Sequence, residues 1–324
     1  MMIMARVVIA KPGSKLGVSK GYLVVRNGSS PEVRVPLNDV DEVIVSSRGV
    51  LISSNLIMEL ALLGIPLYLV RGDGLSVSML WPTIPNKTVM TRRAQYEVVA
   101  NGLAIEYARE FVAAKIHNKA WLLKYLGKSR RRFDVRDCGY LVDDYVGRVR
   151  SCGDVKDLIN VEAEASRKYW RCYAELVSSA GFTFRDQDGT DPVNLSLNYG
   201  YGILKSLVLK SIVIAGLDPY AGFLHVDKSG RPSLILDFME PFRFVVDKAV
   251  AELVVRYVPE VVDGMLSRES RRVIADKVLR AINEDYYSYG NLRRSIADII
   301  KSQARELASS IRSKAPFKAF RVRW

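Results

Sequence analysis

The sequence has few cysteines and few histidines, and both shortages restrict the sites that it can build. Three cysteines, Cys138, Cys152 and Cys172, occur among 324 residues, and no two of them form a Cys-x-x-Cys pair. An odd number without that spacing supports neither a disulfide framework nor a zinc ribbon, so we expect reduced, structural thiols. His117 and His225 are the only histidines available for catalysis or metal binding.

Long hydrophobic runs are also missing. No apolar run reaches the roughly 18 residues that a membrane-spanning helix needs, and the N-terminus lacks the basic, apolar and small-residue segments of a signal peptide. Hydrophobic residues make up 49% and charged residues 26% of the chain, which is the balance of a globular protein. We therefore expect a cytoplasmic protein that does not bind a membrane.

Acidic residues are outnumbered by basic ones. The chain has 48 Lys and Arg against 35 Asp and Glu, and its net charge of +13 favours an anionic partner, above all nucleic acid. Ribosome-associated proteins, membrane-surface proteins and some thermophilic enzymes are equally basic, so charge alone does not decide. Residues 1–90 account for only +3 of the net charge, so we expect the partner to bind mainly the remainder of the chain.

The first 85 residues are predicted to form a small β-rich domain. Gly, Pro, Asn and Ser clusters separate six β-rich runs, which are VVIA, GYLVVR, PEVRVPL, DEVIVSS, IPLYLV and LSVSML. One segment, SSNLIMELALLG, has helical spacing and is expected to end at Gly64. Residues 81–86 (WPTIPN) interrupt the strand pattern, and we interpret them as a linker.

Residues 86–324 are predicted to form a larger, mostly α-helical domain, which makes the fold class α+β. Apolar residues recur at helical spacing from Leu103 onward, with charged residues such as Lys115 and Lys119 at the intervening positions. His117 is interpreted as an ordinary residue of this helix. The basic run KSRRR at residues 128–132 is expected to be a solvated loop.

One helix has clear boundaries, and another follows Glu240. Asp191 is suited to be an N-cap, Pro192 fits the first helical position, and Gly216 is expected to end the helix. Beyond Glu240, apolar residues form a stripe at helical spacing, from Phe242 onward.

Most of the chemically useful side chains lie in residues 216–246. His225 is followed by Asp227 and then by the run SLIL, which leads to Asp237 and Glu240. An imidazole together with carboxylates can hold a divalent ion such as Mg²⁺ or Mn²⁺, since carboxylates supply hard oxygen ligands. The same D-x-x-E pattern is also typical of a capping box, with Asp237 as N-cap and Glu240 at the third helical position. Both interpretations remain open at this point.

A third carboxylate can come from the helix that is expected to begin near Asp154. Glu162 shares a helix face with Ser166 and Tyr169, so it can point inward, whereas Glu164 points elsewhere. A solvent-exposed helix carboxylate is the simpler explanation for either residue.

These segments together resemble a known family. The run GLDPYAGFLHVDKSGRPSLILDFMEPFR is similar to the signature of the CRISPR-associated integrase family, the endonuclease and integrase subunit that acquires spacers from invading DNA. The segments VEAEASRKYW, VNLSLNYGYGIL, KIHNKAWLL and GIPLYLV extend the resemblance over nearly the whole chain. The family also has a β-rich part followed by a helical part.

The resemblance implies a metal site and assigns its ligands. Glu162, His225 and Glu240 match the residues that bind Mg²⁺ or Mn²⁺ in the family, and Asp237 matches a further acid that supports the catalytic site. Glu162 is preferred over Glu164 because the family places its catalytic Glu seven residues before a Tyr. Here that Tyr is Tyr169, although Ala163 replaces the Gly that usually follows the catalytic Glu.

The family's reaction is direct transesterification, in which a 3′-hydroxyl of an incoming DNA fragment attacks a phosphodiester in the repeat array. A bound Mg²⁺ or Mn²⁺ activates that oxygen and neutralises charge on the phosphate, and water in place of the hydroxyl gives nuclease activity. Basic and aromatic side chains are candidate contacts to DNA phosphates, which would make binding depend on salt. They are Arg243, Tyr201, Lys205, Arg92 and Arg93. A core Tyr201 and a solvated Lys205 are the alternatives.

The resemblance further implies partners that the residues alone do not show. These are double-stranded DNA, as incoming fragment and as repeat array, a second copy of the chain bound through the β-rich domain, and a small ferredoxin-like partner nuclease. Two other functions remain open. One is a non-catalytic DNA-binding subunit, and the other is a metal-dependent nuclease that cuts branched DNA or RNA without joining strands.

Overall fold

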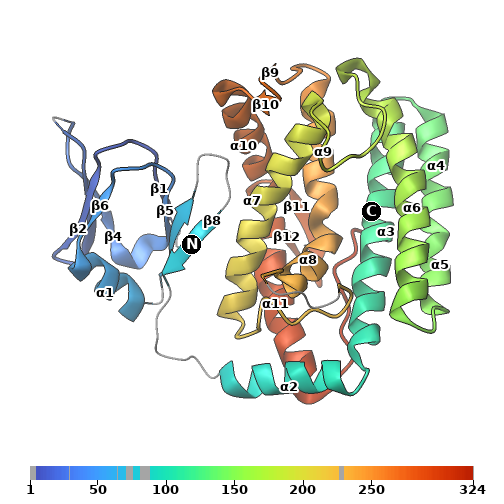
Figure 1. Cartoon of the computed structure of the whole chain (residues 1–324), viewed down its shortest axis with the longest axis horizontal. Coiled ribbons are helices and arrows are strands. Elements are labelled where there is room, and N and C mark those ends of the chain that lie inside the picture. The colour runs from blue at the N-terminus through green and yellow to red at the C-terminus, as the bar shows by residue number, and fades with distance from the viewer. Residues whose placement is uncertain are drawn as a thin grey trace. The chain divides into compact units, whose positions relative to one another are not determined.

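The computed structural model describes residues 5–28, 30–63, 65–70, 76–80, 88–225 and 230–323. The chain divides into two compact units, Met1–Asn86 and Lys87–Trp324. Strands make up most of the first unit, coloured blue in Figure 1, and helices dominate the second, from cyan to red. The expected fold class is therefore confirmed. The linker expected at residues 81–86 lies outside the described residues.

The first unit contains a sheet of mixed direction. Strand β1 (Ala5–Ile9) runs parallel to β5 (Val40–Val45), which runs parallel to β7 (Leu67–Val70). Strand β8 (Ser76–Leu80) is antiparallel to β7 and completes the order β1-β5-β7-β8. These four strands coincide with four of the predicted β-rich runs.

A second sheet in this unit has the order β4-β3-β2-β6. Strand β3 (Tyr22–Arg26) is antiparallel to both β4 (Val33–Pro36) and β2 (Lys15–Ser19), and β2 is parallel to β6 (Leu51–Ile52). Strands β2 and β6 lie outside the six predicted β-rich runs. Lys, Gly and Ser occupy three of the five positions of β2, so its pairing on both sides defines it as a strand, rather than its local pattern.

One apolar core joins the two sheets and helix α1 (Ser54–Leu62). A short 3₁₀ helix, η1 (Leu37–Asp39), lies between β4 and β5 in the chain. Ser53 caps α1, because its side chain accepts the backbone N–H of Leu56. The predicted helix is confirmed, while its expected stop at Gly64 lies outside the described residues. Buried side chains of both sheets, including Leu23 and Leu67, form the core with this helix.

The second unit is built on long helices. The helices are α2 (Thr88–Ala100), α3 (Ala104–Ser129), α4 (Phe133–Asp143), α5 (Tyr145–Arg150), α6 (Val155–Val177), α7 (Pro192–Ile214), α8 (Ser233–Met239), α9 (Arg243–Val254), α10 (Arg268–Asn283) and α11 (Ile296–Ser313). Helix α3 packs against α4, α6 and α9, and α7 packs against α9, α10 and α11. Among the described residues, no helix is long and apolar enough to cross a membrane.

Short 3₁₀ helices and two hairpins complete this unit. The 3₁₀ helices are η2 (Ser178–Ala180) and η3 (Glu240–Phe242), and the hairpins pair β9 (Val261–Val262) with β10 (Met265–Leu266) and β11 (Tyr286–Tyr289) with β12 (Leu292–Ser295). The prediction of a mostly helical domain did not include these hairpins.

The helix boundaries read from caps are confirmed. Asp191 accepts the backbone N–H groups of Val193 and Asn194, Pro192 is the first residue of α7, and Gly216 follows the helix with a φ of 82°. Asp154 caps α6 in the same way, accepting the N–H of Asp157. Local capping chemistry is therefore sufficient to define these helix ends.

The basic run at residues 128–132 is not a simple solvated loop. Helix α3 continues to Ser129, and the half-buried Arg130 donates hydrogen bonds to the carbonyls of Leu176 and Ala251. These carbonyls lie near the C-terminal ends of α6 and α9, where helix carbonyls lack partners within the helix. Arg130 therefore joins the ends of two helices, which the run of charges did not indicate.

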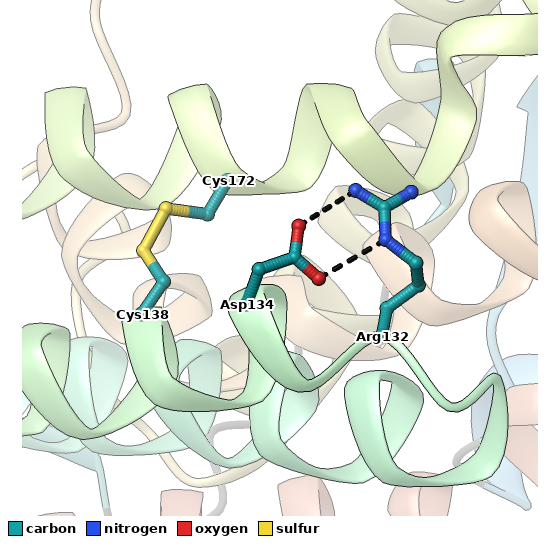
Figure 2. Close-up of a disulfide and its surroundings, with 4 residues drawn as sticks. All are labelled: Arg132, Asp134, Cys138 and Cys172. Atoms are coloured by element: carbon teal, nitrogen blue, oxygen red, sulfur yellow. Dashed lines mark hydrogen bonds and ion pairs between the residues drawn. A yellow bond between two sulfur atoms is a disulfide. The ribbon is translucent and has the colours of Figure 1, made fainter.

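The expectation of reduced thiols is wrong for two of the three cysteines. Cys138 on α4 and Cys172 on α6 form a disulfide, and Cys152 is free and buried (Figure 2). Near the disulfide, Arg132 forms an ion pair with Asp134. The two bonded cysteines are 34 positions apart in sequence, and the packing of α4 against α6 brings them together. Cysteine number and spacing contain no information about that packing.

Candidate active site

Asp237 is the buried anchor of the histidine loop. It lies in α8 and is completely buried, and its Oδ2 accepts the backbone N–H groups of Phe223 at 2.6 Å and Leu224 at 2.8 Å. Its Oδ1 accepts the backbone N–H of His225 at 3.2 Å and also binds Nδ1 of the His225 imidazole. One carboxylate therefore fixes both the backbone and the ring of His225.

The capping-box interpretation of Asp237 is wrong. Helix α8 begins at Ser233, so Asp237 is inside the helix and its carboxylate binds a neighbouring loop instead of its own helix start. The apolar run SLIL already belongs to the helix. The loop approaches α8 closely at Gly222, where a Cβ atom would come within 2.6 Å of Ser233 Cβ and 2.9 Å of Asp237 Oδ2. The loop cannot take this path with a side chain at that position.

Glu162 and Glu240 meet at a single lysine. Nζ of Lys115, on α3, lies 2.6 Å from Oε1 of Glu162 on α6 and 2.6 Å from Oε2 of Glu240 at the start of η3. Ser166 donates a hydrogen bond of 2.6 Å to the same oxygen of Glu162, and Nε of Arg243 lies 2.9 Å from Oε1 of Glu240. Two of the three predicted ligands are thus brought together from distant parts of the chain.

The surrounding cations keep both glutamates ionised. Burial by itself would raise the pKa of Glu240, but the charges of Arg243 and Lys115 lower it to about 2. For Glu162, burial again acts to raise the pKa, and Lys115 reverses the effect, so that the pKa lies below its usual value. The site therefore holds two charged carboxylates at neutral pH, of which Glu240 is buried and Glu162 is partly buried.

The donor chemistry of these residues fits a hard divalent cation. Oε2 of Glu240 is buried, and its contact with Lys115 does not meet hydrogen-bond geometry, so it has no hydrogen-bond donor among the described residues. His225 binds Asp237 through Nδ1, the arrangement that in metal sites directs Nε2 toward a metal. Within the part of the chain that the structure describes, however, no three His, Cys, Asp or Glu side chains lie close enough to hold a metal ion. Asp227, which follows His225 closely in sequence, lies outside the described residues.

Glu164 and His117 are bound elsewhere. Glu164 forms an ion pair of 2.7 Å with Arg148 and is exposed, whereas Glu162 faces the helical interior. His117 is half-buried in α3, with Nδ1 3.1 Å from Asp143 and Nε2 3.0 Å from the carbonyl of Val322. His117 is therefore the ordinary helix residue that was expected.

The predicted DNA-contacting residues differ in exposure. Arg92 and Arg93 are exposed on α2, and Lys205 is partly exposed on α7. Tyr201 is only 7% exposed, and its hydroxyl binds Asp247. The guanidinium of Arg243 lies 4.7 Å from the centre of the Tyr201 ring. Tyr201 thus supports Arg243 from the protein interior instead of facing solvent.

Lys115 and Lys119 contact the candidate site, although the sequence pattern placed them only at positions between the apolar residues of the helix. Lys119 is buried and Lys115 is mostly buried, with a side chain 12% exposed. Lys119 lies over the ring of Tyr169 at 4.3 Å and over Trp170 at 4.1 Å. Burial lowers the pKa of Lys119 to about 8. The missed signal was the i, i+4 spacing, because positions 107, 111, 115 and 119 continue a single stripe of α3 that faces the core.

One cavity of the helical unit is lined by residues other than the predicted ligands. It measures about 1170 Å³, and Trp121, Tyr125, Lys248 and the first strand of the β11–β12 hairpin contribute to its lining. None of the predicted ligands lines it. This cavity therefore does not mark the candidate site.

Two ionised acids from separate helical segments meet at one lysine, and a buried carboxylate orients the imidazole of His225. Acids and imidazoles of this kind are the groups that metal-dependent enzymes use as ligands. A family model described as CRISPR associated protein Cas1 matches residues 7–285. The CRISPR-associated endonuclease Cas1 of Hyperthermus butylicus is 36% identical over 326 residues, which cover 97% of this chain and 97% of the relative. The chain belongs to the Cas1 family of CRISPR-associated endonucleases.

Solved structures agree on the fold. A casposase bound to integration product has a TM-score of 0.79 at 23% sequence identity, covering 99% of this chain and 96% of the casposase chain. A chain of a Cas6-RT-Cas1--Cas2 complex has a TM-score of 0.76 at 17% identity, covering 99% of this chain and 36% of the longer chain. The family resemblance found in the sequence is confirmed over nearly its whole length.

Proposed function

We propose that this protein is a metal-dependent DNA endonuclease and integrase that inserts fragments of invading DNA into a CRISPR repeat array. The reaction is transesterification, in which a 3′-hydroxyl of the fragment attacks a phosphodiester of the repeat. The observation that carries the proposal is the meeting of Glu162 and Glu240 at one cation in a member of the Cas1 family. Buried acids that remain ionised are the donors that a Mg²⁺ or Mn²⁺ site requires.

Glu162, Glu240 and Nε2 of His225 are the proposed ligands of this metal. When bound, the metal would activate the attacking oxygen and neutralise charge that builds on the phosphate. Asp237 holds the His225 ring in one orientation by binding Nδ1, and Arg243 holds Glu240 through Nε. These contacts restrict the rotamers of the ligands before DNA arrives.

The proposed DNA contacts follow from exposure and charge. Arg243 is next to Glu240, and its terminal nitrogens are suited to bind a phosphate as a planar, two-pronged donor. Tyr201 would act on DNA only through Arg243, because its ring supports the guanidinium and its hydroxyl binds Asp247. Lys205, Arg92 and Arg93 are the more exposed candidates, and we propose that they contact phosphates of the duplex.

The proposed assembly contains a second copy of the chain, joined through the β-rich domain, and a small ferredoxin-like partner nuclease. One structural neighbour is described as bound to integration product, and another as part of a complex with Cas2, which supports a substrate complex and a protein partner for this chain. The net charge of +13 suits a polyanionic substrate, and we propose that this substrate is double-stranded DNA.

A strand-transfer assay tests the proposal. A labelled duplex with a free 3′-hydroxyl is incubated with a repeat-bearing plasmid and the protein, with Mg²⁺, with Mn²⁺ or with EDTA. Joined product that requires the metal supports the integrase function. Cleavage without joining would favour a nuclease of branched DNA or RNA, and tight binding without either reaction would favour a non-catalytic subunit.

A further inference from the structure

Lys115 occupies the position between the two carboxylates that a shared metal would require. Its Nζ lies 2.6 Å from an oxygen of Glu162 and 2.6 Å from an oxygen of Glu240, and its side chain is only 12% exposed. We propose that Lys115 is a resident cation that holds these acids together before metal binds and competes with the divalent metal for them. This inference rests on the metal site in the proposed function.

The distances make exchange between the two cations feasible. A Mg²⁺ ion binds carboxylate oxygens at about 2.1 Å, only slightly closer than the ammonium contacts in this site. Because Oε1 of Glu162 and Oε2 of Glu240 each lie 2.6 Å from the same Nζ atom, the two oxygens are already close to each other. A metal therefore needs little movement of Glu162 or Glu240, but it cannot share the position with Nζ.

The two contacts of Lys115 are not equivalent. Lys115 donates a true hydrogen bond to Oε1 of Glu162, whereas its contact with Oε2 of Glu240 does not meet hydrogen-bond geometry. Each glutamate also has a second partner, which is Ser166 for Glu162 and Arg243 for Glu240. Both carboxylates thus keep a fixed orientation when Lys115 withdraws.

The chemistry of lysine suits this exchange. Its charge is compact and sits on a flexible stem with several rotatable bonds, so it can leave a carboxylate without any shift of the backbone. An ammonium group and a divalent ion that bind the same carboxylates repel each other, so the presence of Lys115 opposes metal binding. Without Lys115, metal-free protein would hold two buried carboxylates that repel each other.

Direct measurement of Mn²⁺ binding tests the inference. Electron paramagnetic resonance of free Mn²⁺ gives the dissociation constant for wild-type protein and for the Lys115→Met and Lys115→Gln variants. We expect both variants to bind Mn²⁺ at least about tenfold more tightly, because the competing charge is gone. Lys124→Met is the matched control, since Lys124 is a buried lysine of the same helix and pairs with a different acid, Asp143. This control should bind Mn²⁺ as wild type does.

Thermal unfolding gives a second readout that does not depend on activity. In EDTA, Lys115→Met should unfold at a lower temperature than wild type, and Mn²⁺ should raise its midpoint by more than it raises that of wild type. Lys115→Gln keeps a hydrogen-bond donor, so it provides the measurement if the methionine variant does not fold.

The possible outcomes separate the inference from the proposed function. Equal or weaker Mn²⁺ binding by folded Lys115 variants would overturn the inference while leaving the metal site intact. Failure of wild type and variants alike to bind Mn²⁺ would overturn the metal site, and with it both the proposed function and the inference.

Discussion

Asp237 binds the imidazole of His225 and three backbone N–H groups of the loop that carries it, through one fully buried carboxylate. A buried carboxylate with several donors is well compensated, so it can hold the loop firmly against α8. Asp237 contributes by positioning His225 and does not need to touch DNA or metal.

Removing the Asp237 carboxylate should reduce activity and stability together. We expect Asp237→Ala to lower strand transfer about 10- to 100-fold, the usual cost of losing a partner that orients a ligand. It should also destabilise the fold by about 1–3 kcal/mol, because buried N–H groups lose their acceptor. Strand-transfer rates and urea unfolding measure the two effects, with the exposed Asp134→Ala as control. Full activity in Asp237→Ala would show that the orientation of His225 is held by other contacts.

Lys119 should make stability depend on pH. Because burial lowers its pKa to about 8, the folded protein releases this proton at lower pH than the unfolded chain, where the ordinary value is 10.5. Between these values the unfolded state binds more protons, so the free energy of unfolding should rise with pH, by at most about 1.4 kcal/mol per pH unit.

Comparison with Lys119→Met isolates this contribution. Urea unfolding of both proteins should be measured between pH 7.5 and about 10. We expect the free energy of unfolding of wild type to increase with pH relative to that of the variant. Parallel curves would mean that Lys119 keeps an ordinary pKa in the folded protein.

The disulfide between α4 and α6 should stabilise the helical unit. Closing a loop of 34 residues is expected to contribute about 4 kcal/mol in the chain-entropy model. Reduction, or the change Cys138→Ser, should therefore lower the unfolding midpoint, and Cys172→Ser should have the same effect. Differential scanning calorimetry with and without reductant measures the loss, and Cys152→Ser controls for removal of a buried thiol. If reductant left the wild-type midpoint unchanged, the two cysteines would not be bonded in solution.

Features set by neighbouring residues in sequence were predictable. The cap Asp191 predicted the start of α7, because a capping side chain acts on amides two or three residues away. The pairing of Cys138 with Cys172 and the contact of Lys115 with Glu162 were not predictable in this way, since both depend on how α3, α4 and α6 pack.

In the candidate site, too, the contacts between distant segments could not be predicted from local sequence. The D-x-x-E spacing fitted a helix cap as well as a metal site, and only the loop at residues 223–225 shows where the carboxylate of Asp237 points. Glu162 was chosen over Glu164 by family resemblance, and the structure places Glu162 at Lys115 and Glu164 at Arg148. Helix periodicity alone could not choose between them, because it does not specify which face meets another helix.

The most direct test is strand transfer by single variants of the three proposed ligands, Glu162→Gln, His225→Ala and Glu240→Gln. Glu164→Gln is the matched control, because it removes an exposed acid two positions along the same helix. We expect each ligand variant to lose metal-dependent cleavage and joining by more than the roughly 100-fold cost of disturbing an orienting partner. DNA binding should stay close to wild type, and the control should remain active. Full strand transfer by His225→Ala would contradict the proposed site.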